Sequence, residues 1–498
     1  MQYQVSQNID PDKIFLVNFS ELEGRLEPEF YKPSLASLEK HIRSFSSHRL
    51  KDYALSIAGG ATPKKTEADK FYSDSESGIP FLRVQNLQIS GELSLDDCVY
   101  INEDTHNGML KRSQVEEGDL LVKITGVGRM AIASIAPDGF VGNTNQHMVV
   151  IKTGDAVISK YLARYLNLDI IERIASRHST GGTRPALDYP SLKNIPVIEG
   201  IDFSIIDNAL LYKHQKEQQA EALLNSIDDY MLGELGITLP QKDAYYFDYC
   251  AEPQAEYGIH KEFELYENNR LVRDEQIFLT NFSEVCGNRL DPFYYQKKYK
   301  VIDDIIDKLS NKCYLGDVIN KLNNGIEVRD YIENGYRYLR VTDLGKNELN
   351  NSSPRYININ EIPSRIKLNE NCILVSRSGS LGLINEVNTD MLDYVLSSHI
   401  FKVELKNELI NPKFAVEILR NKICQEQIFR NNNGGIIPEI QQNALKSIRI
   451  PLPPLEKQQK IVDHITAIRQ QAKALQEEGK TILEDAKKEV ERMILGNE

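Results

Sequence analysis

The stretch "IFLVNFSELEGRLEPEFY" at Ile14–Tyr31 returns almost unchanged as "IFLTNFSEVCGNRLDPFYY" at Ile277–Tyr295. A repeat inside one chain is interpreted first, because a duplicated unit decides the fold. Further pairs follow in the same order: Phe81–Leu87 with Tyr338–Leu344, Leu120–Gly128 with Ile373–Gly382, Asn145–Lys152 with Ser397–Leu405, Ser191–Val197 with Ala444–Ile450, and Leu211–Lys216 with Leu455–Lys460. The order predicts a large domain used twice, with an approximate two-fold relation between the copies.

Each copy combines short strands with a helix. Short β-branched or aliphatic runs bounded by Gly, Pro or Asp predict strands. These runs lie at 80–90, 118–125 and 131–136 in the first copy and at 337–343, 372–376 and 399–405 in the second. A single helix is expected over 158–178 and another over 411–431, because apolar residues recur there at helical spacing. Each helix ends in a Gly-Gly loop, at 179–187 and 431–440, so the fold class is α/β.

Each copy closes with a longer helix, expected at about 203–235 and about 455–495. Apolar residues in these helices alternate steps of four and three, which is typical of a coiled-coil seam. The seam residues are Leu223, Ile227 and Met231 in the first helix and Ile461, Ile465, Ile468 and Leu475 in the second. The pattern favours an antiparallel coiled coil between the two helices, and the alternative is that each helix packs on its own domain.

The amino-acid composition limits the classes of protein to which the chain can belong. A chain of 498 residues is too long to form one compact core. Its content of 41% hydrophobic and 26% charged residues is ordinary for a soluble globular protein. No apolar run approaches the ~18 residues of a membrane helix, and the N-terminus lacks the pattern of a signal peptide, so a cytoplasmic protein is expected. The six cysteines form no CxxC or CxxH pair, which argues against structural zinc and disulfides. A net charge of −13 argues weakly against nucleic acid, although charge can be segregated on the surface.

No self-contained catalytic centre is visible, so no catalytic or metal-binding residue is predicted. The chain has no Walker phosphate loop, no HExxH and no GxGxxG between a strand and a helix. His147 and His399 occupy matching positions, which favours a role in the fold over catalysis.

Polar residues of types that contact bases and phosphates accompany the matched segments. They are Arg83, Lys123, Arg129, Thr180 and Arg184 in the first copy and Arg340, Ser376, Arg377 and Asn432 in the second. These residues are the predicted DNA contacts. Arg83 and Arg340, which sit in matched "LRV" segments, could instead brace the fold through an internal ion pair.

The chain resembles the specificity (S) subunit of Type I restriction-modification enzymes. The resemblance rests on the duplication, on "IPLPPLEKQQKIV" at Ile450–Val462 and on the Gly-Gly loop that precedes "SLKNIPV". It implies two target recognition domains that each recognise one part of a split site in double-stranded DNA. It also implies that the long helices space the domains and bind two modification subunits, which methylate adenine with S-adenosylmethionine. ATP-driven cleavage belongs to separate restriction subunits, so this chain itself is expected to hold no cofactor.

The expected division is a first target recognition domain at 1–200, a central helix at 201–236, a second recognition domain at 277–450 and a C-terminal helix at 451–498. Residues 237–276 are longer than the bare turn that the resemblance implies, and they are interpreted as a linker or a docking segment. A rigid helix of this length predicts two half-sites of ~3–5 base pairs separated by a gap of ~5–8 base pairs.

Two other functions compete with the specificity subunit. One is a scaffold whose duplicated domains bind proteins without specific DNA recognition. The other is a nuclease or methyltransferase with a degenerate site. An enzyme would act alone, a specificity subunit only with its partner, and a scaffold would bind no specific DNA.

Overall fold

A computed structural model describes residues 10–96, 98–239, 266–267, 270–271, 292–433 and 437–496. Most of the predicted linker at 237–276 and most of the second opening segment at 277–295 lie outside the described residues. No helix within the described ranges is both long enough and apolar enough to cross a membrane.

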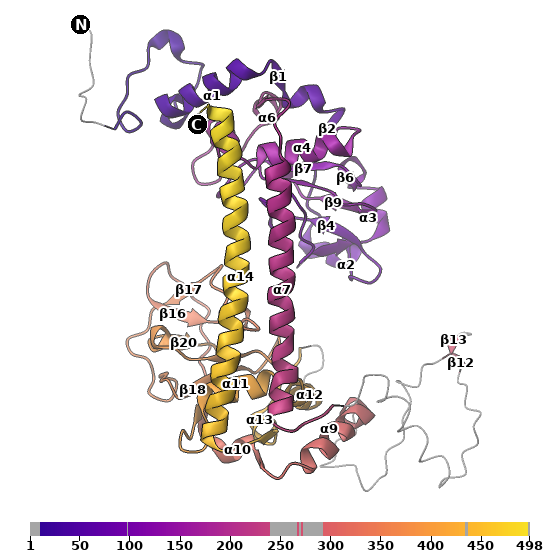
Figure 1. Ribbon diagram of the computed structural model, residues 1–498, viewed down its shortest axis with the longest axis vertical. Helices are drawn as coiled ribbons and strands as arrows, with labels where there is room; N and C mark the ends of the chain where they lie inside the picture. Colours follow the sequence, from indigo (N-terminus) through magenta and orange to yellow (C-terminus); the bar gives the residue numbers. More distant parts are fainter. Residues whose placement is uncertain are drawn as a thin grey trace. The chain divides into compact units, whose positions relative to one another are not determined.

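The chain divides into two compact units. Unit 1 comprises residues 1–218 and 474–498, and unit 2 comprises residues 219–473. The boundary passes through both long helices, α7 (Ser204–Glu234) and α14 (Leu455–Leu495). Each helix therefore contributes one part to each unit, and each unit is described by itself (Figure 1).

Unit 1 contains three sheets and a set of short helices. The first sheet has the strand order β2 (Ser56–Gly59), β10 (Met148–Lys152), β7 (Leu120–Lys123) and β8 (Ala133–Ile135). The second has the order β3 (Tyr72–Ser73), β5 (Val99–Ile101), β4 (Ile79–Leu82), β9 (Val141–Thr144) and β6 (Gln114–Glu116). A two-stranded sheet pairs β1 (His48–Arg49) with β11 (Pro196–Val197). The helices are α1 (Pro33–Phe45), α2 (Ala68–Phe71), α3 (Glu103–Asn107), α4 (Ala156–Leu166), α5 (Asp169–His178) and α6 (Tyr189–Lys193).

Unit 2 repeats the order of the first sheet. Its strands are β15 (Ile319–Asn324), β21 (Ile400–Leu405), β18 (Cys372–Ser376) and β19 (Ile384–Glu386). A second sheet has the order β17 (Arg355–Ile357), β16 (Tyr336–Leu339) and β20 (Val395–Leu396), and β14 (Lys312–Tyr314) pairs with β22 (Arg449–Pro451). The helices are α9 (Lys297–Asp307), α10 (Leu315–Val318), α11 (Pro412–Arg420), α12 (Lys422–Arg430) and α13 (Gln442–Lys446). The short strands β12 (Tyr266–Glu267) and β13 (Arg270–Leu271) pair antiparallel. The predicted mixed α/β fold is confirmed.

The helix predicted in each copy is two helices, because an asparagine ends the first one. In unit 1 the Asn167 side chain bonds the main chain of Ala133 in both directions, at 2.6 and 3.2 Å. In unit 2 the Asn421 amide donates to Asp228 Oδ1 on α7 at 2.9 Å, and its oxygen accepts from Ile423 N at 3.2 Å. Side chains that satisfy free main-chain groups favour a helix end, so the α4–α5 and α11–α12 breaks have a tertiary cause.

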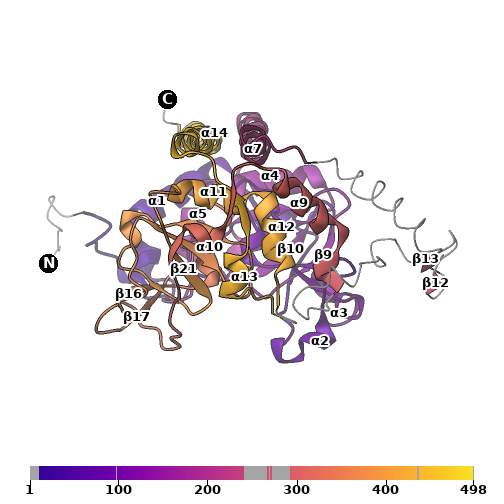
Figure 2. The same ribbon diagram turned by 90° about the horizontal axis from the view of Figure 1, so that it is seen from below.

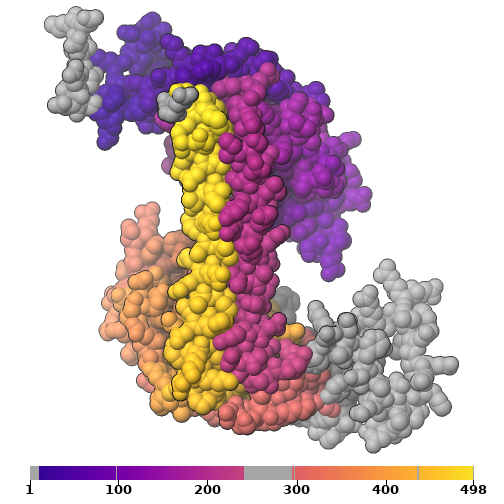
Figure 3. Space-filling view, in the orientation of Figure 1, coloured from indigo at the N-terminus to yellow at the C-terminus, as the bar shows by residue number. Residues whose placement is uncertain are grey.

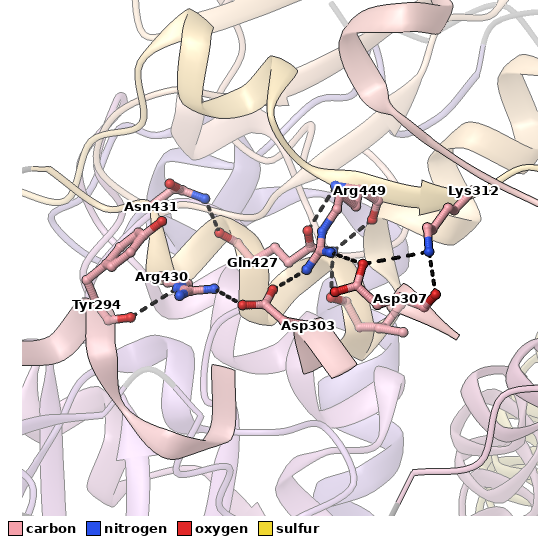
Figure 4. A network of polar contacts seen from close by, with 9 residues as sticks. Tyr294, Asp303, Asp307, Lys312, Gln427, Arg430, Asn431 and Arg449 are labelled. Carbon is pink, nitrogen blue, oxygen red and sulfur yellow. Dashed lines mark hydrogen bonds and ion pairs between the residues drawn. The ribbon is translucent and has the colours of Figure 1, made fainter. Parts of the chain in front are cut away.

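An arginine docks the end of the opening segment in each unit. On α5, Arg177 Nε donates to Phe30 O at 2.7 Å, and its guanidinium lies 4.4 Å from the centre of the Phe30 ring. On α12, Arg430 Nε donates to Tyr294 O at 3.0 Å, with its guanidinium 4.2 Å from the Tyr294 ring (Figure 4). The repeated opening segment therefore ends in the same packing in both units.

The same arginines also bind a carboxylate on the first helix after each opening segment, which is α1 in unit 1 and α9 in unit 2. Arg177 and His178 contact Glu39 on α1, which also accepts from Arg43 Nη2 at 2.7 Å. In unit 2, Asp303 on α9 accepts from Arg430 at 2.7 Å and also contacts Arg449, as Figure 4 shows. Because the carboxylate and the opening segment share one guanidinium, the segment and the first helix are held together.

The long helices run antiparallel within each unit, and two views show them side by side (Figures 2 and 3). In unit 1, Tyr212 Oη donates to Glu478 Oε1 at 2.6 Å. In unit 2, the rings of Tyr230 and His464 lie 4.0 Å apart. Tyr212 thus lies beside Glu478 and Tyr230 beside His464, so residue numbers rise along α7 in the direction in which they fall along α14. The two parts of α14 belong to different cores, with Leu483, Ala486, Val490 and Ile494 in unit 1 and Ile461, Val462, Ile465 and Ile468 in unit 2.

Replacing Ile468 by lysine should destabilise unit 2. Ile468 is buried in one core with Ile227 and Met231, so I468K places a charge among apolar side chains. We expect a loss of about 3 kcal/mol or more in the free energy of unfolding, measured by urea denaturation. T466K, at an exposed position of the same helix, is the control and should unfold as the wild-type chain does. Equal loss in both variants would contradict a core role for this face of α14.

Glu39 should make unit 1 sensitive to acid. Burial raises its pKa, but the hydrogen bond and charge of His178, together with Arg43 and Arg177, outweigh burial and lower the pKa from 4.5 to about 2. The ionised form therefore stabilises the fold above about pH 4.5, and this contribution is lost as the pH falls toward about 2. We expect E39Q to lose about 3 kcal/mol of unfolding free energy near neutral pH and less in acid.

Urea unfolding of the wild-type chain and of E39Q across this pH range measures the difference. E29Q, at an exposed carboxylate paired only with Lys32, should leave the unfolding midpoint unchanged. A difference between wild type and E39Q that does not shrink with falling pH would contradict the assignment.

Candidate nucleic-acid interface

Three loops meet at one end of the first sheet of unit 1. β2 and β7 both run antiparallel to β10, so the ends of β2 and β7 lie beside the start of β10. The loops are 60–64, 124–132 and 145–147, and the Gly-Gly loop at 179–187 joins them. We call these four segments, and the matching 325–330, 377–383, 397–399 and 431–440 of unit 2, the loop clusters; residues 434–436 lie outside the described ranges.

Main-chain hydrogen bonds hold the loop cluster of unit 1. Ile124 N donates to His147 O at 3.0 Å, and Leu187 N donates to Ile124 O at 2.8 Å. Gly126 N donates to Pro185 O at 3.0 Å, which attaches the Gly-Gly loop to the turn after β7.

The loop cluster of unit 2 repeats these bonds position by position. Arg377 N donates to His399 O at 2.8 Å, and Ile440 N donates to Arg377 O at 2.9 Å. Gly379 N donates to Pro438 O at 3.0 Å. His147 and His399 thus contribute main-chain carbonyls to the framework.

Two matched glycines allow the close approach of these loops. A Cβ on Gly60 would lie 2.0 Å from Thr144 O, and a Cβ on Gly325 would lie 2.1 Å from Leu396 O. No side chain fits at either position. The framework is therefore common to both units, and only the side chains that project from it differ.

Four of the predicted contacts in unit 1 lie in the loop cluster or at its edge, but two of these are engaged within the protein. Lys123 is buried, its Nζ donates to Val127 O at 2.8 Å, and burial lowers its pKa. Arg129 donates to Asn167 O at 2.6 Å and pairs with Asp169 at the start of α5.

Arg184 and Thr180 are exposed on the Gly-Gly loop. Burial lowers the pKa of His147, and the positive charge of Arg184 lowers it further. The Arg184 guanidinium therefore influences His147, in the middle of the loop cluster, electrostatically. Arg83 lies elsewhere, at the start of a short helical turn beside the second sheet, where its N–H donates to Asn86 Oδ1 at 2.8 Å.

The predicted residues of unit 2 are more enclosed. Arg377 pairs with Glu439 at 2.6 Å, and Ser376 is fully buried with its hydroxyl accepting from Leu383 N at 3.0 Å. Asn432 Oδ1 accepts from Glu439 N at 2.9 Å. Arg340 holds the buried Asp343 at 2.9 and 3.1 Å, so it forms the internal ion pair considered as the alternative.

Several exposed polar residues of the clusters were not predicted. In unit 1 the Thr62 hydroxyl bonds Gln146, and just outside the cluster Tyr189 lies over Gly59. In unit 2 the His399 charge lowers the pKa of Glu327, after the larger effect of Arg329. The matching segments "NQH" at 145–147 and "SSH" at 397–399 were the sequence signal for these residues, but the prediction used only the histidine that they share. Among the described residues, no group of three or more His, Cys, Asp or Glu could hold a metal ion.

The predicted helix-seam residues fall in two places. Ile227, Met231, Ile461, Ile465 and Ile468 share one core cluster, and Leu223 packs against it. Leu475 is half-buried and lies in the part of α14 that belongs to unit 1.

Comparison with known proteins identifies part of the chain. Residues 296–484 match the family model described as the Type I restriction modification DNA specificity domain. The specificity subunit of the Type I restriction enzyme EcoBI from Escherichia coli is 23% identical over 199 residues, which are 39% of this chain and 40% of that relative's length. The resemblance to Type I specificity subunits is thereby confirmed.

Two solved structures are also similar. A chain of the structure described as the basis of complex assembly and conformational transition of the type I R-M system is 15% identical, with a TM-score of 0.37, and the match covers 90% of this chain and 96% of that one. The S subunit of a Type I restriction-modification system from M. genitalium is 12% identical, with a TM-score of 0.31 and coverage of 89% and 95%.

Arg184→Ala should weaken DNA binding without destabilising the protein, because the side chain is exposed on the Gly-Gly loop. If the guanidinium contacts a base, we expect a loss of roughly 1–3 kcal/mol and relaxed preference at one position of the target. Binding is measured by gel shift on a panel of single-base variants of the target, with melting temperature as the stability control. Arg173→Ala removes the same charge from the exposed face of α5 and should change neither quantity. A uniform loss across the panel would indicate a phosphate contact instead.

Proposed function

We propose that this chain, in which residues 296–484 form a Type I restriction modification DNA specificity domain, is the DNA sequence-specificity subunit of a Type I restriction-modification complex. It recognises double-stranded DNA and carries no catalytic centre. Adenine methylation and ATP-dependent cleavage belong to partner modification and restriction subunits, which use S-adenosylmethionine and ATP. The chain itself needs no cofactor, and the complex acts in the cytoplasm.

One observation carries this proposal beyond the family match. Each unit has a loop cluster with the same main-chain bonds, whereas the side chains on the two clusters differ. Unit 1 presents Arg184, Thr180 and Gln146, and unit 2 presents Glu439 and His399 around Arg377. Two domains that recognise different base sequences need a common frame with different polar side chains. The frame positions each domain on the DNA, and the side chains that contact bases determine which sequence it recognises.

The target is therefore bipartite. Each loop cluster contacts one half-site of ~3–5 base pairs, and a stretch of ~5–8 base pairs between them is not read. The first recognition domain comprises residues 1–200 and the second residues 277–450. The helices at 201–236 and 451–498 hold them apart as an antiparallel coiled coil and bind two modification subunits, and residues 237–276 are a linker or a further docking segment.

Exchange of one recognition domain should change one half-site only. We expect the complete system in a host to methylate a split motif, and replacement of residues 51–198 by the matching part of a relative to change one half of that motif. Sequencing of the methylated genome measures both. The reciprocal exchange of residues 319–450 is the control and should change the other half.

Three results would contradict the proposal. A single continuous motif, or an exchange that alters both halves, would contradict two separate readers. Methylation by the purified chain alone would indicate an enzyme, and a complete system without specific DNA binding would favour the protein-binding scaffold.

A further inference from the structure

Unit 2 contains a pocket of about 460 Å³ on its first sheet. Two strands, β15 and β21, form its floor, and the turn that precedes β18 forms its wall. The lining residues are Lys321, Leu322, Asn323, Ser364, Arg365, Lys402 and Glu404.

Lys402 is buried at the floor of this pocket. Its side chain is 4% exposed, and its Nζ donates to Lys367 O at 2.5 Å. Ile366 N and Lys367 N both donate to Pro363 O, at 2.9 and 3.2 Å, so residues 363–367 form a tight turn. The lysine therefore fixes the turn that presents Arg365 at the rim of the pocket.

The pocket carries an excess of positive charge. Lys321, Arg365 and Lys402 face the single carboxylate of Glu404. Glu404 lies 3.6 Å from Lys402 and 4.0 Å from Lys321, longer than the ~2.7–2.9 Å of a tight charge-assisted hydrogen bond. One Glu404 oxygen already accepts from Asn320 at 2.7 Å. The cations are thus incompletely neutralised, in a chain whose net charge is −13.

Unit 1 has an apolar side chain at the matching position. Lys402 pairs with Leu374 on β18, and Val150 pairs with Leu121 on β7 in the same register. Val150 is buried in an apolar cluster with Leu121 and Met148. Burial of a lysine where a valine completes the same fold costs free energy. The packing of the sheet therefore does not itself require a lysine at this position, and Lys402 adds a positive charge to the pocket as well as holding the turn.

The pocket borders the loop cluster of unit 2. Asn323 lines the pocket, and the adjacent Asn324 accepts from Gln442 Nε2 at 3.0 Å. Gly325, the next residue, begins the loop cluster. DNA lying across the loop cluster would therefore bring its backbone over the rim of the pocket.

We propose that this pocket binds a phosphodiester group of the DNA backbone beside the half-site recognised by unit 2. Lys321 and Arg365 contact the phosphate oxygens, and Lys402 is a positioning residue that holds the turn and adds charge. This inference rests on the proposed function and adds a contact that distinguishes the two halves, because unit 1 has no lysine at that position.

The salt dependence of DNA binding tests the proposal. The full complex is titrated with a duplex that carries its methylated motif, over a range of salt concentrations. Log K falls with log salt, and each lost phosphate contact reduces the magnitude of this negative slope by about 0.9. We expect K321Q and R365Q each to reduce the magnitude of the slope by about 1 and the double variant by about 2, with an unchanged motif. Both side chains are exposed, so neither substitution threatens the fold.

K308Q is the matched control, because Lys308 is an exposed lysine at the end of α9. It should leave the slope unchanged. A double variant with the wild-type slope overturns the pocket assignment while specific binding, and with it the proposed function, stands. A wild-type complex without specific binding overturns both. If millimolar inorganic phosphate raises the melting temperature of the wild-type complex but not of R365Q, and the slopes are equal, the pocket takes free phosphate and the backbone assignment is wrong.

Discussion

A main-chain amide enclosed by other loops must find a carbonyl partner, and this requirement organises both loop clusters. Ile124 and Arg377 each donate their amide to a histidine carbonyl and accept from the end of the Gly-Gly loop through their own carbonyl. These bonds involve no side-chain atom, so almost any residue can occupy these positions. The glycines at 60 and 325 are the exception, because the neighbouring carbonyl leaves no room for a Cβ. A frame of this kind keeps its geometry while the side chains that project from it change.

The two units use that freedom differently. Asp343 in unit 2 is replaced by Asn86 in unit 1, so the Arg340 guanidinium is held by a carboxylate, whereas the neutral Asn86 accepts from the main-chain N–H of Arg83. Arg377 is paired with Glu439, whereas Arg184 is exposed on its loop. Lys402 occupies the site of Val150. Each exchange alters local charge without altering the strand order, which is how related domains come to recognise different ligands.

The long helices connect this frame to the rest of the chain. Each places one part in the core of each unit, so the core of unit 1 combines residues from both ends of the sequence, whereas the core of unit 2 is built from residues between them. The repeated opening segments serve a related purpose. Arg177 and Arg430 hold the end of the segment and a carboxylate of the following helix at once, which anchors α1 beside α5 and α9 beside α12.

The sequence by itself determined the repeat, the α/β class and the positions of the long helices and of some strands, because these depend on local periodicity and on repetition within the chain. Buried seam positions such as Ile461 and Ile465 were visible for the same reason. The division of each shorter helix was not visible, since it depends on an asparagine whose partner, Ala133 or Asp228, is distant in sequence. The state of each predicted DNA contact was likewise decided by tertiary structure. An arginine or serine has the same letter whether it is exposed, as Arg184 is, or enclosed, as Ser376 is, and only the packing of distant segments distinguishes the two.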